Sequence, residues 1–236
     1  MNELSVEIWS DLVCPWCFLA KRRFELALST FEHRANVQVR WRAFQLDPDA
    51  PKQSTKTISE RMRRDLGMHH VQIRAQLDRI TGLAAEMGLH YQVADARVVN
   101  SFDAHRLQAY ADDVGVGDAV RERLMRAYTE ECADLGSPQN LVQLAAEAGL
   151  APDQTRRILA GHDYADAVQA DEERARRLGI SGVPAFVFAE RHLVSGAQPA
   201  GTFLDKLRRV WARTAAREQA GTGQDAPACT GPGQCD

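Results

Sequence analysis

Two cysteines with two residues between them, Cys14 and Cys17, are the strongest candidates for chemistry in this sequence. Pro15 and Trp16 separate them within the stretch SDLVCPWCFLAKRRFELAL, residues 10–28. Two thiols at this spacing can bind a metal, form a structural disulfide, or cycle between dithiol and disulfide. Because each use belongs to a different class of protein, the elements around the pair have to decide between them.

The cysteine pair lies at a predicted junction between a strand and a helix. Residues 4–9 alternate apolar and polar side chains, as a strand with one buried face does. From about Pro15 onward, apolar residues recur at helical spacing. This stripe consists of Cys17, Ala20, Phe24, Ala27, Leu28 and Phe31. Cys14 therefore stands at a helix N-terminus, where unpaired N–H groups and the positive dipole end stabilise a thiolate.

The two thiols of the pair are expected to have different roles. Since Cys17 belongs to the apolar stripe, burial should raise the pKa of its thiol. We predict that Cys14 exchanges with a substrate sulfur and that Cys17 resolves the resulting mixed disulfide. A zinc site would need two more ligands, and the five residues between Cys229 and Cys235 exceed the usual spacing. We therefore expect no metal.

Composition narrows the class of protein further. The chain has 236 residues, of which 44% are hydrophobic, and a net charge of -3, so nucleic acid is not an expected partner. The N-terminus lacks a basic start followed by an apolar stretch, and no apolar run is long enough to span a membrane. We therefore expect a cytoplasmic protein without a membrane partner. In a reducing cytosol, a close cysteine pair is more often catalytic, redox-sensing or metal-binding than a permanent staple.

The remaining pattern predicts an α/β protein interrupted by a long helical block. Residues 37–43 alternate again, which predicts a second strand parallel to the first. A short hairpin is predicted at 184–196, followed by a last helix at 199–217. Between the strands, helices are predicted near 57–66, 70–87, 100–114, 117–135, 138–148, 152–160 and 163–178. Because neither end of the chain can bury a sheet alone, we expect the two ends to form one mixed sheet.

A second signal lies far downstream, where Val183-Pro184 precedes a predicted strand in SGVPAFVF. Cys-Pro-Trp-Cys after a first strand, a helical insertion and GVPAF together resemble the DsbA-like branch of the thioredoxin superfamily. The chain looks most similar to FrnE-like oxidoreductases, relatives of kappa-class glutathione transferases and 2-hydroxychromene-2-carboxylate isomerases. Supporting stretches are WRAFQLDP, NSFDAHRLQAYA and VSGAQP, and the resemblance covers roughly residues 4–211.

This resemblance implies a thioredoxin fold with a large inserted all-helical domain, and thiol–disulfide exchange as the activity. The predicted thioredoxin-like domain consists of residues 1–50 and 173–217, with the insertion at 51–172. Residues 218–236 are predicted to form a flexible tail, because they are small, polar and rich in Gly and Pro.

The resemblance also implies roles for residues outside the cysteine pair. It implies that Pro184 is cis and faces the pair, where neighbouring backbone can bind a substrate strand. It places Asn100, His105 and Arg106 on an insertion helix near the active-site cleft; helix packing and solvated charge are the alternatives for His105 and Arg106. Asp11 is expected either to tune the thiols as a nearby acid or to hold a loop or cap.

The other cysteines have separate predictions. A disulfide between Cys229 and Cys235 would order only a tail, so a purely structural disulfide is a poor explanation for this pair. We predict that this pair forms a second redox couple that exchanges electrons with the first or caps it. A metal-binding or scavenging tail and the absence of any role are the alternatives. Cys132 falls on the apolar face of its predicted helix, which indicates a small buried hydrophobe.

The sequence therefore predicts a cytosolic thiol–disulfide oxidoreductase or isomerase that needs no metal or organic cofactor. Its expected partners are protein thiols and disulfides, or glutathione as a co-substrate. One alternative is a glutathione-dependent isomerase or transferase acting on small aromatic or polyketide molecules. Cys14 stands where those relatives usually carry serine, which favours disulfide chemistry. The other alternative is a chaperone-like binder of unfolded chains. The direction of exchange stays open.

Overall fold

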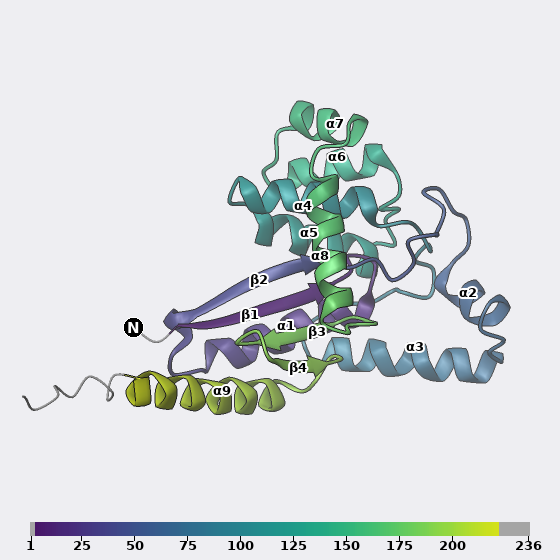
Figure 1. Cartoon of the computed structure of the whole chain (residues 1–236). Helices are drawn as coiled ribbons and strands as arrows, with labels where there is room; N and C mark the ends of the chain where they lie inside the picture. Colours follow the sequence, from purple (N-terminus) through teal and green to yellow (C-terminus); the bar gives the residue numbers. More distant parts are fainter. Residues whose placement is uncertain (1–2, 222–236) are drawn as a thin grey trace, which may run out of the picture.

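A mixed sheet forms the centre of the fold (Figure 1). The structure is a computed structural model and describes residues 3–221. Within that range the sheet has four strands in the order β2-β1-β3-β4. The strands are β1 (Leu4–Ser10), β2 (Val37–Ala43), β3 (Ala185–Phe188) and β4 (His192–Ser195).

The pairing of the strands joins the two ends of the chain. β1 runs parallel to β2, with Leu4 opposite Val37, as the β-α-β pattern predicted. On its other side β1 pairs antiparallel with β3, where Trp9 lies opposite Ala185, and β3 pairs antiparallel with β4. The prediction that both ends contribute to one mixed sheet is confirmed.

One face of this sheet is covered by α1 (Pro15–Ser29) and α9 (Ala200–Gly221). The predicted stripe of α1 supplies Phe24 to this layer, where its ring packs against Phe186 and Phe203 at centroid distances of 5.4 and 5.7 Å. The fully buried side chains of the layer include Leu4, Val6, Ile8, Ala20, Phe31, Phe188 and Leu207. Both the period of two in β1 and the helical period in α1 therefore point into the same core.

The opposite face is covered by α8 (Ala165–Arg177), which packs on β2 and on Trp9 of β1. The Trp9 indole N–H donates to the carbonyl of Asp171 at 3.1 Å, which fixes the helix to the sheet. The predicted boundary between residues 172 and 173 falls inside this helix. The division of the chain into domains stays a prediction.

The predicted helical block is confirmed, and it lies beside the sheet at the carboxyl end of β1 (Figure 1). Besides α8 it contains α2 (Ile58–Arg64), α3 (His70–Ala85), α4 (Phe102–Asp113), α5 (Gly117–Glu130), α6 (Pro138–Glu147) and α7 (Pro152–Ala160). Within residues 3–221, none of the helices combines the length and the apolar character needed to cross a membrane.

One prediction for this block is wrong. Helix α5 ends at Glu130, so Cys132 lies beyond the helix and adopts a left-handed backbone conformation with φ 54°. Its side chain is half-buried, and its Sγ lies 3.1 Å from the carbonyl oxygen of Gln92, to which the thiol donates. The apolar spacing that continues past Glu130 therefore belongs to a turn and not to a helical face.

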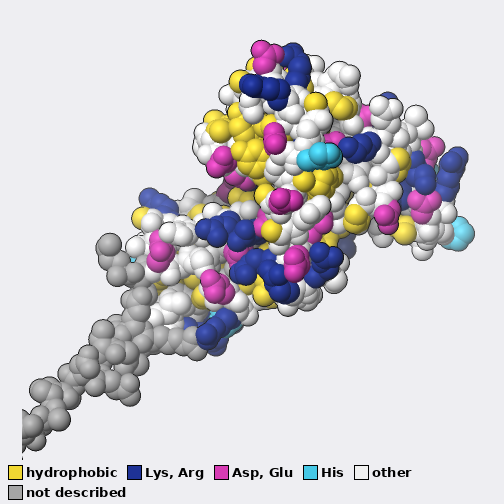
Figure 2. Space-filling model, turned by 45° about the horizontal axis from the view of Figure 1, so that its top comes forward, with side chains coloured by type: hydrophobic (Ala, Val, Ile, Leu, Met, Phe, Trp, Pro, Cys, Tyr) yellow, Lys and Arg dark blue, Asp and Glu magenta, His cyan; other side chains and the backbone are white. Residues whose placement is uncertain are grey.

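Charged side chains of both signs are interspersed over the face shown in Figure 2. The side chain of Arg174 is nevertheless not simply solvated: it donates to the carboxylate of buried Glu7 at 2.6 Å. Arg42 donates to the same carboxylate, also at 2.6 Å. Burial raises the pKa of Glu7, but the hydrogen bonds from Arg174 and Arg42 outweigh it, so the pKa lies below its ordinary value.

Replacing Glu7 with glutamine should lower the free energy of unfolding at neutral pH by roughly 2 kcal/mol, because two guanidinium groups lose their shared carboxylate. Since folding lowers the pKa from 4.5, this stabilisation is present above pH 4.5 and is lost as the pH falls through the lowered pKa. Urea unfolding of both chains between neutral pH and pH 3 measures the effect. A difference between the chains that stays constant over this range would contradict the prediction. Glu173→Gln, which breaks an exposed pair with Arg177, is the matched control.

Candidate active site

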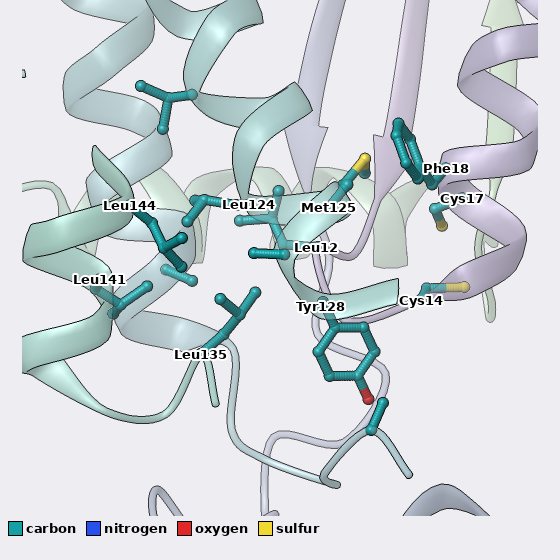
Figure 3. Close-up of a cluster of buried hydrophobic side chains, with 14 of the residues drawn as sticks. Leu12, Cys14, Cys17, Phe18, Leu124, Met125, Tyr128, Leu135, Leu141 and Leu144 are labelled. Carbon is teal, nitrogen blue, oxygen red and sulfur yellow. The ribbon is translucent and has the colours of Figure 1, made fainter. Parts of the chain in front are cut away.

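The two cysteines lie where α1 meets the helical block (Figure 3). Cys14 is the residue that precedes the first turn of α1, and Cys17 follows within that turn. Both are free thiols, and both are buried, with 4% of Cys14 and 1% of Cys17 exposed. They belong to the same apolar cluster as Leu12 from the loop between β1 and α1 and Tyr128 from α5. The pair is therefore enclosed by elements that are far apart in the sequence.

The surroundings of Cys17 bear out its predicted shielding. Burial raises the pKa of the Cys17 thiol well above its ordinary value, and the hydrogen bond and charge of the Cys14 sulfur raise it further. The backbone N–H of Asp11 and the hydroxyl of Ser10 act in the opposite direction, because they face the sulfur as donors. Cys17 is thus a protonated thiol that two nearby donors can stabilise when it loses its proton.

Asp11 connects the cysteine pair to two other segments. Its side chain is 0% exposed, and one carboxylate oxygen accepts the N–H of Leu46 at 2.8 Å. The other oxygen accepts the N–H of Val13 at 3.3 Å and lies 3.2 Å from Nε2 of His105. The backbone carbonyl of Asp11 accepts the N–H of Cys14 at 3.2 Å. The geometry therefore supports the loop-holding role for Asp11 and places His105 beside the Asp11 carboxylate.

Two other residues that the resemblance singled out bind backbone groups. Asn100 Nδ2 donates to the carbonyl of Pro48 at 2.7 Å, and Asn100 Oδ1 accepts the N–H of Phe102 at 2.9 Å. Arg106 donates to the carbonyls of Gly161 and Asp163 at 2.8 and 2.9 Å. The prediction that Asn100 lies on a helix is wrong, since α4 begins at Phe102 and Asn100 fixes the loop before it. Arg106 lies on α4, as predicted, and fixes the connection between α7 and α8.

The Val183-Pro184 peptide bond is cis, as the resemblance implied. Val183 packs against the large apolar cluster to which both cysteines belong. The carbonyl of Pro184 is bonded to the N–H of Gly196 at 2.8 Å, which ties this bend to the loop after β4. Trp16, between the cysteines, is 36% exposed. It is the solvent-facing part of the motif.

Tyr91 is a site residue that the sequence did not reveal. Its hydroxyl donates to the carbonyl of Pro15 at 2.7 Å, and its ring stacks on Phe18 at a centroid distance of 6.4 Å. Burial raises the pKa of this phenol, and the nearby sulfurs of Cys14 and Cys17 add to the effect. Tyr91 follows α3 in an irregular segment, where no periodic pattern could single it out.

Tyr91→Phe should lower the free energy of unfolding by about 1 kcal/mol, because the hydroxyl that binds the Pro15 carbonyl is lost. For a chain of this size, that loss lowers the thermal midpoint by about 2–4 °C. Calorimetry of the variant measures the shift. Tyr164→Phe is the control, since its hydroxyl binds Asp113 at the surface; an equal shift in both variants would contradict a special role for Tyr91.

The second cysteine pair, Cys229 and Cys235, lies outside the described residues. Its predicted exchange with the first pair therefore stays a prediction.

Comparison with known proteins agrees with this geometry. A crystal structure of a probable DsbA oxidoreductase from Streptomyces coelicolor is 39% identical, with a TM-score of 0.86 over 89% of this chain and 91% of that chain. The cytosolic disulfide reductase DsbM from Pseudomonas aeruginosa is 17% identical and shares the fold, with a TM-score of 0.56 over 92% of this chain and 99% of that chain. The uncharacterized protein YwbO of Bacillus subtilis (strain 168) is 24% identical over 186 residues, which are 78% of this chain and 86% of YwbO.

The family model for the DSBA-like thioredoxin domain matches residues 5–208, a range that includes the cysteine pair, the helical block and the cis proline. The mixed sheet, the helices on both of its faces and this match agree, and the chain belongs to the DSBA-like thioredoxin domain family.

Proposed function

We propose that this protein is a thiol–disulfide oxidoreductase in which Cys14 is the nucleophile and Cys17 the resolving thiol. The observation that carries the proposal is the pair of free thiols at the start of α1, in a DsbA-like fold. Cys14 precedes α1 and is 4% exposed, whereas Cys17 is 1% exposed and faces Ser10 and Asp11. The two thiols therefore have the unequal surroundings that their two roles require.

The proposed reaction has two exchange steps. The Cys14 thiolate attacks a substrate disulfide, which forms a Cys14–substrate disulfide and releases the other substrate sulfur as a thiolate. The Cys17 thiolate then attacks Cys14, which forms the Cys14–Cys17 disulfide and releases the second substrate sulfur with its electron pair. The substrate disulfide is reduced by two electrons and the protein pair is oxidised by two. The reverse sequence oxidises a substrate dithiol.

We further propose that the protein works in the cytosol, as an FrnE-like enzyme, with protein disulfides as substrates and glutathione as the thiol that restores the pair. Glutathione is proposed because DsbM, which shares the fold and is 18% identical to this chain, has a structure with GSH. Cys229 and Cys235 are proposed as a second redox couple. If Cys229→Ser/Cys235→Ser leaves both turnover and the reduction potential of the first pair unchanged, that second couple has no role in exchange.

A redox titration against glutathione tests the proposed function. After each equilibration, alkylation and mass spectrometry assign which cysteines are oxidised; we expect Cys14 and Cys17 to form one disulfide in a two-electron transition. Reduction of insulin disulfides measures turnover in parallel. Suppression of aggregation without insulin reduction would instead indicate a chaperone-like binder. Conjugation or isomerisation of small aromatic substrates that survives Cys17→Ser would indicate a glutathione-dependent transferase or isomerase.

A further inference from the structure

A small polar cavity lies between the sheet and the helical block. Its volume is about 40 Å³, and it is lined by the end of β1, by β2, and by residues of α4, α5 and α8. At ~10–15 Å³ for each water molecule, it has room for about two or three waters. The polar residues that line it are Ser10, Arg42, His105, Gln108, Asp112, Arg121 and Asp171.

Two unpartnered oxygens show what the cavity holds. In the part of the chain that the structure describes, the buried side-chain oxygens without a hydrogen-bond partner are Ser10 Oγ and Gln108 Oε1. Both residues line this cavity. The Gln108 amide nitrogen is already bonded to the carbonyl of Gly117 at 2.8 Å, so its oxygen is left for the cavity. Because an unpaired buried oxygen costs about 1–3 kcal/mol, the cavity is a site for water.

Ser10 links the cavity to Cys17, because Ser10 lines the cavity and Cys17 does not. Against the burial that raises the pKa of the Cys17 thiol, the Ser10 hydroxyl acts to lower it. Ser10 Oγ has no hydrogen-bond partner among the described residues, so the hydroxyl can turn toward the sulfur or toward water. At the outer end, the side chain of Asp112 is 45% exposed and is held by Arg121 at 2.9 Å. Polar groups thus line the way from the buried sulfur to the surface.

We propose that this cavity is the route by which Cys17 exchanges its proton with solvent, and that Ser10 Oγ relays the proton between the sulfur and the cavity water. The inference rests on the proposed function, since it concerns the resolving step. Ser10 and Gln108 are positioning residues in this scheme: Ser10 holds the relay hydroxyl beside the sulfur, and Gln108 holds the water.

In the resolving step, the Cys17 thiol gives its proton to Ser10 Oγ while the Ser10 hydroxyl gives its own proton to the cavity water, so Ser10 is unchanged. The cavity water passes this proton on to solvent. The Cys17 thiolate then attacks the Cys14 sulfur, the Cys14–Cys17 bond forms, and the bond from Cys14 to the substrate sulfur breaks. The substrate leaves with the electron pair as a thiolate and takes a proton from solvent. In the reverse direction, the same route returns the proton to Cys17.

Charged and titratable groups surround both ends of this route. Those near Cys17 are Cys14, Asp11, Tyr91 and, through the buried pair with Asp11, His105. Those lining the cavity from the other elements are Arg42 on β2, Asp112 and Arg121 from the helical block, and Asp171 on α8. Arg42 is paired with Glu7 and Asp171, and Arg121 with Asp112, so the charges along the route are largely compensated.

A two-step reaction with the coloured aryl disulfide dithiobis(nitrobenzoate) tests the route. The full chain carries Cys132→Ser, Cys229→Ser and Cys235→Ser, so that only the first pair reacts. The first release of aryl thiolate reports attack by Cys14, and the second reports resolution by Cys17. Because the aryl thiolate leaves without needing a proton, the second rate depends on the loss of the Cys17 proton.

Ser10→Ala should slow the second release about tenfold, equivalent to about one pKa unit at Cys17, and change the first by less than about twofold. The pH profile of the second release should move to higher pH. Ser10→Thr keeps the hydroxyl, and the adjoining cavity has space for its methyl group, so it should restore the second rate. Gln108→Leu, which replaces a polar wall of the cavity, should slow the second release while Ser10 stays in place.

Thr129→Val is the matched control, since it removes a buried hydroxyl that binds only the carbonyl of Met125 at 2.8 Å. It should leave both releases unchanged. A second release that is unchanged in folded Ser10→Ala and Gln108→Leu would overturn the proton route and leave the proposed function intact. Failure of the first release in the otherwise unsubstituted background chain would contradict the proposed function itself, and the route with it.

Discussion

Cys14→Ser is expected to abolish disulfide reduction, with a loss of at least about a thousandfold, because no thiolate remains to form the mixed disulfide. Cys17→Ser should lose turnover equally, but for a different reason. Its Cys14 can still attack, and the absence of a resolving thiol leaves the substrate attached. Mass spectrometry should therefore find a stable adduct of substrate on Cys17→Ser and none on Cys14→Ser.

This asymmetry follows from the positions of the two sulfurs. Cys14 precedes the first turn of α1 and is 4% exposed, whereas Cys17 lies within that turn, is 1% exposed, and faces Ser10 and the backbone N–H of Asp11. Cys132→Ser is the matched control, since its half-buried thiol binds the carbonyl of Gln92. It should keep full insulin reduction. An adduct on Cys14→Ser alone would exchange the two assigned roles. Equal adducts on both variants would show that neither cysteine has a distinct role.

Much of the fold is readable from the sequence because its signals are local. The alternation in β1 and the helical stripe of α1 both mark the side chains that meet in the core, such as Ile8 and Phe24. The packing of α8 on the sheet cannot be predicted from such local patterns. Its charges predict a solvated surface, yet Arg174 reaches Glu7 on β1, and Ala175 packs against the sheet. Contacts between residues so far apart in the chain leave no local pattern.

In the candidate site, too, some residues are marked by a local sequence signal and others only by tertiary contacts. The cysteine pair and the cis proline follow from a motif and a resemblance. Ser10, Tyr91 and Gln108 do not, because each is a single polar residue whose importance comes from a tertiary contact. Cys132 shows the opposite error, since its helical spacing continues past the point where the helix ends.

Asp11 has two interpretations, an acid that tunes the thiols and a group that holds a loop, and its hydrogen bonds favour the second. Both oxygens of its carboxylate are engaged as acceptors. They accept the N–H groups of Leu46 and Val13, and one of them lies 3.2 Å from His105 Nε2. The carboxylate therefore fixes the loop after β2 and the loop before α1, and the cysteines are placed through the Asp11 backbone.

Asp11→Ala should accordingly lower the free energy of unfolding by roughly 3 kcal/mol, because two backbone donors and an imidazole lose their acceptor in a buried site. Asp11→Asn keeps one acceptor oxygen and the shape, so about half of that loss is expected. Urea unfolding measures both, with Asp47→Ala as the control because its carboxylate pairs with Arg61 near the surface. In Asp11→Asn the reduction potential of the pair should shift by less than about 30 mV, the change produced by a tenfold difference in the exchange equilibrium. A larger shift with little loss of stability would show that the Asp11 charge, and not the loop it holds, acts on the thiols.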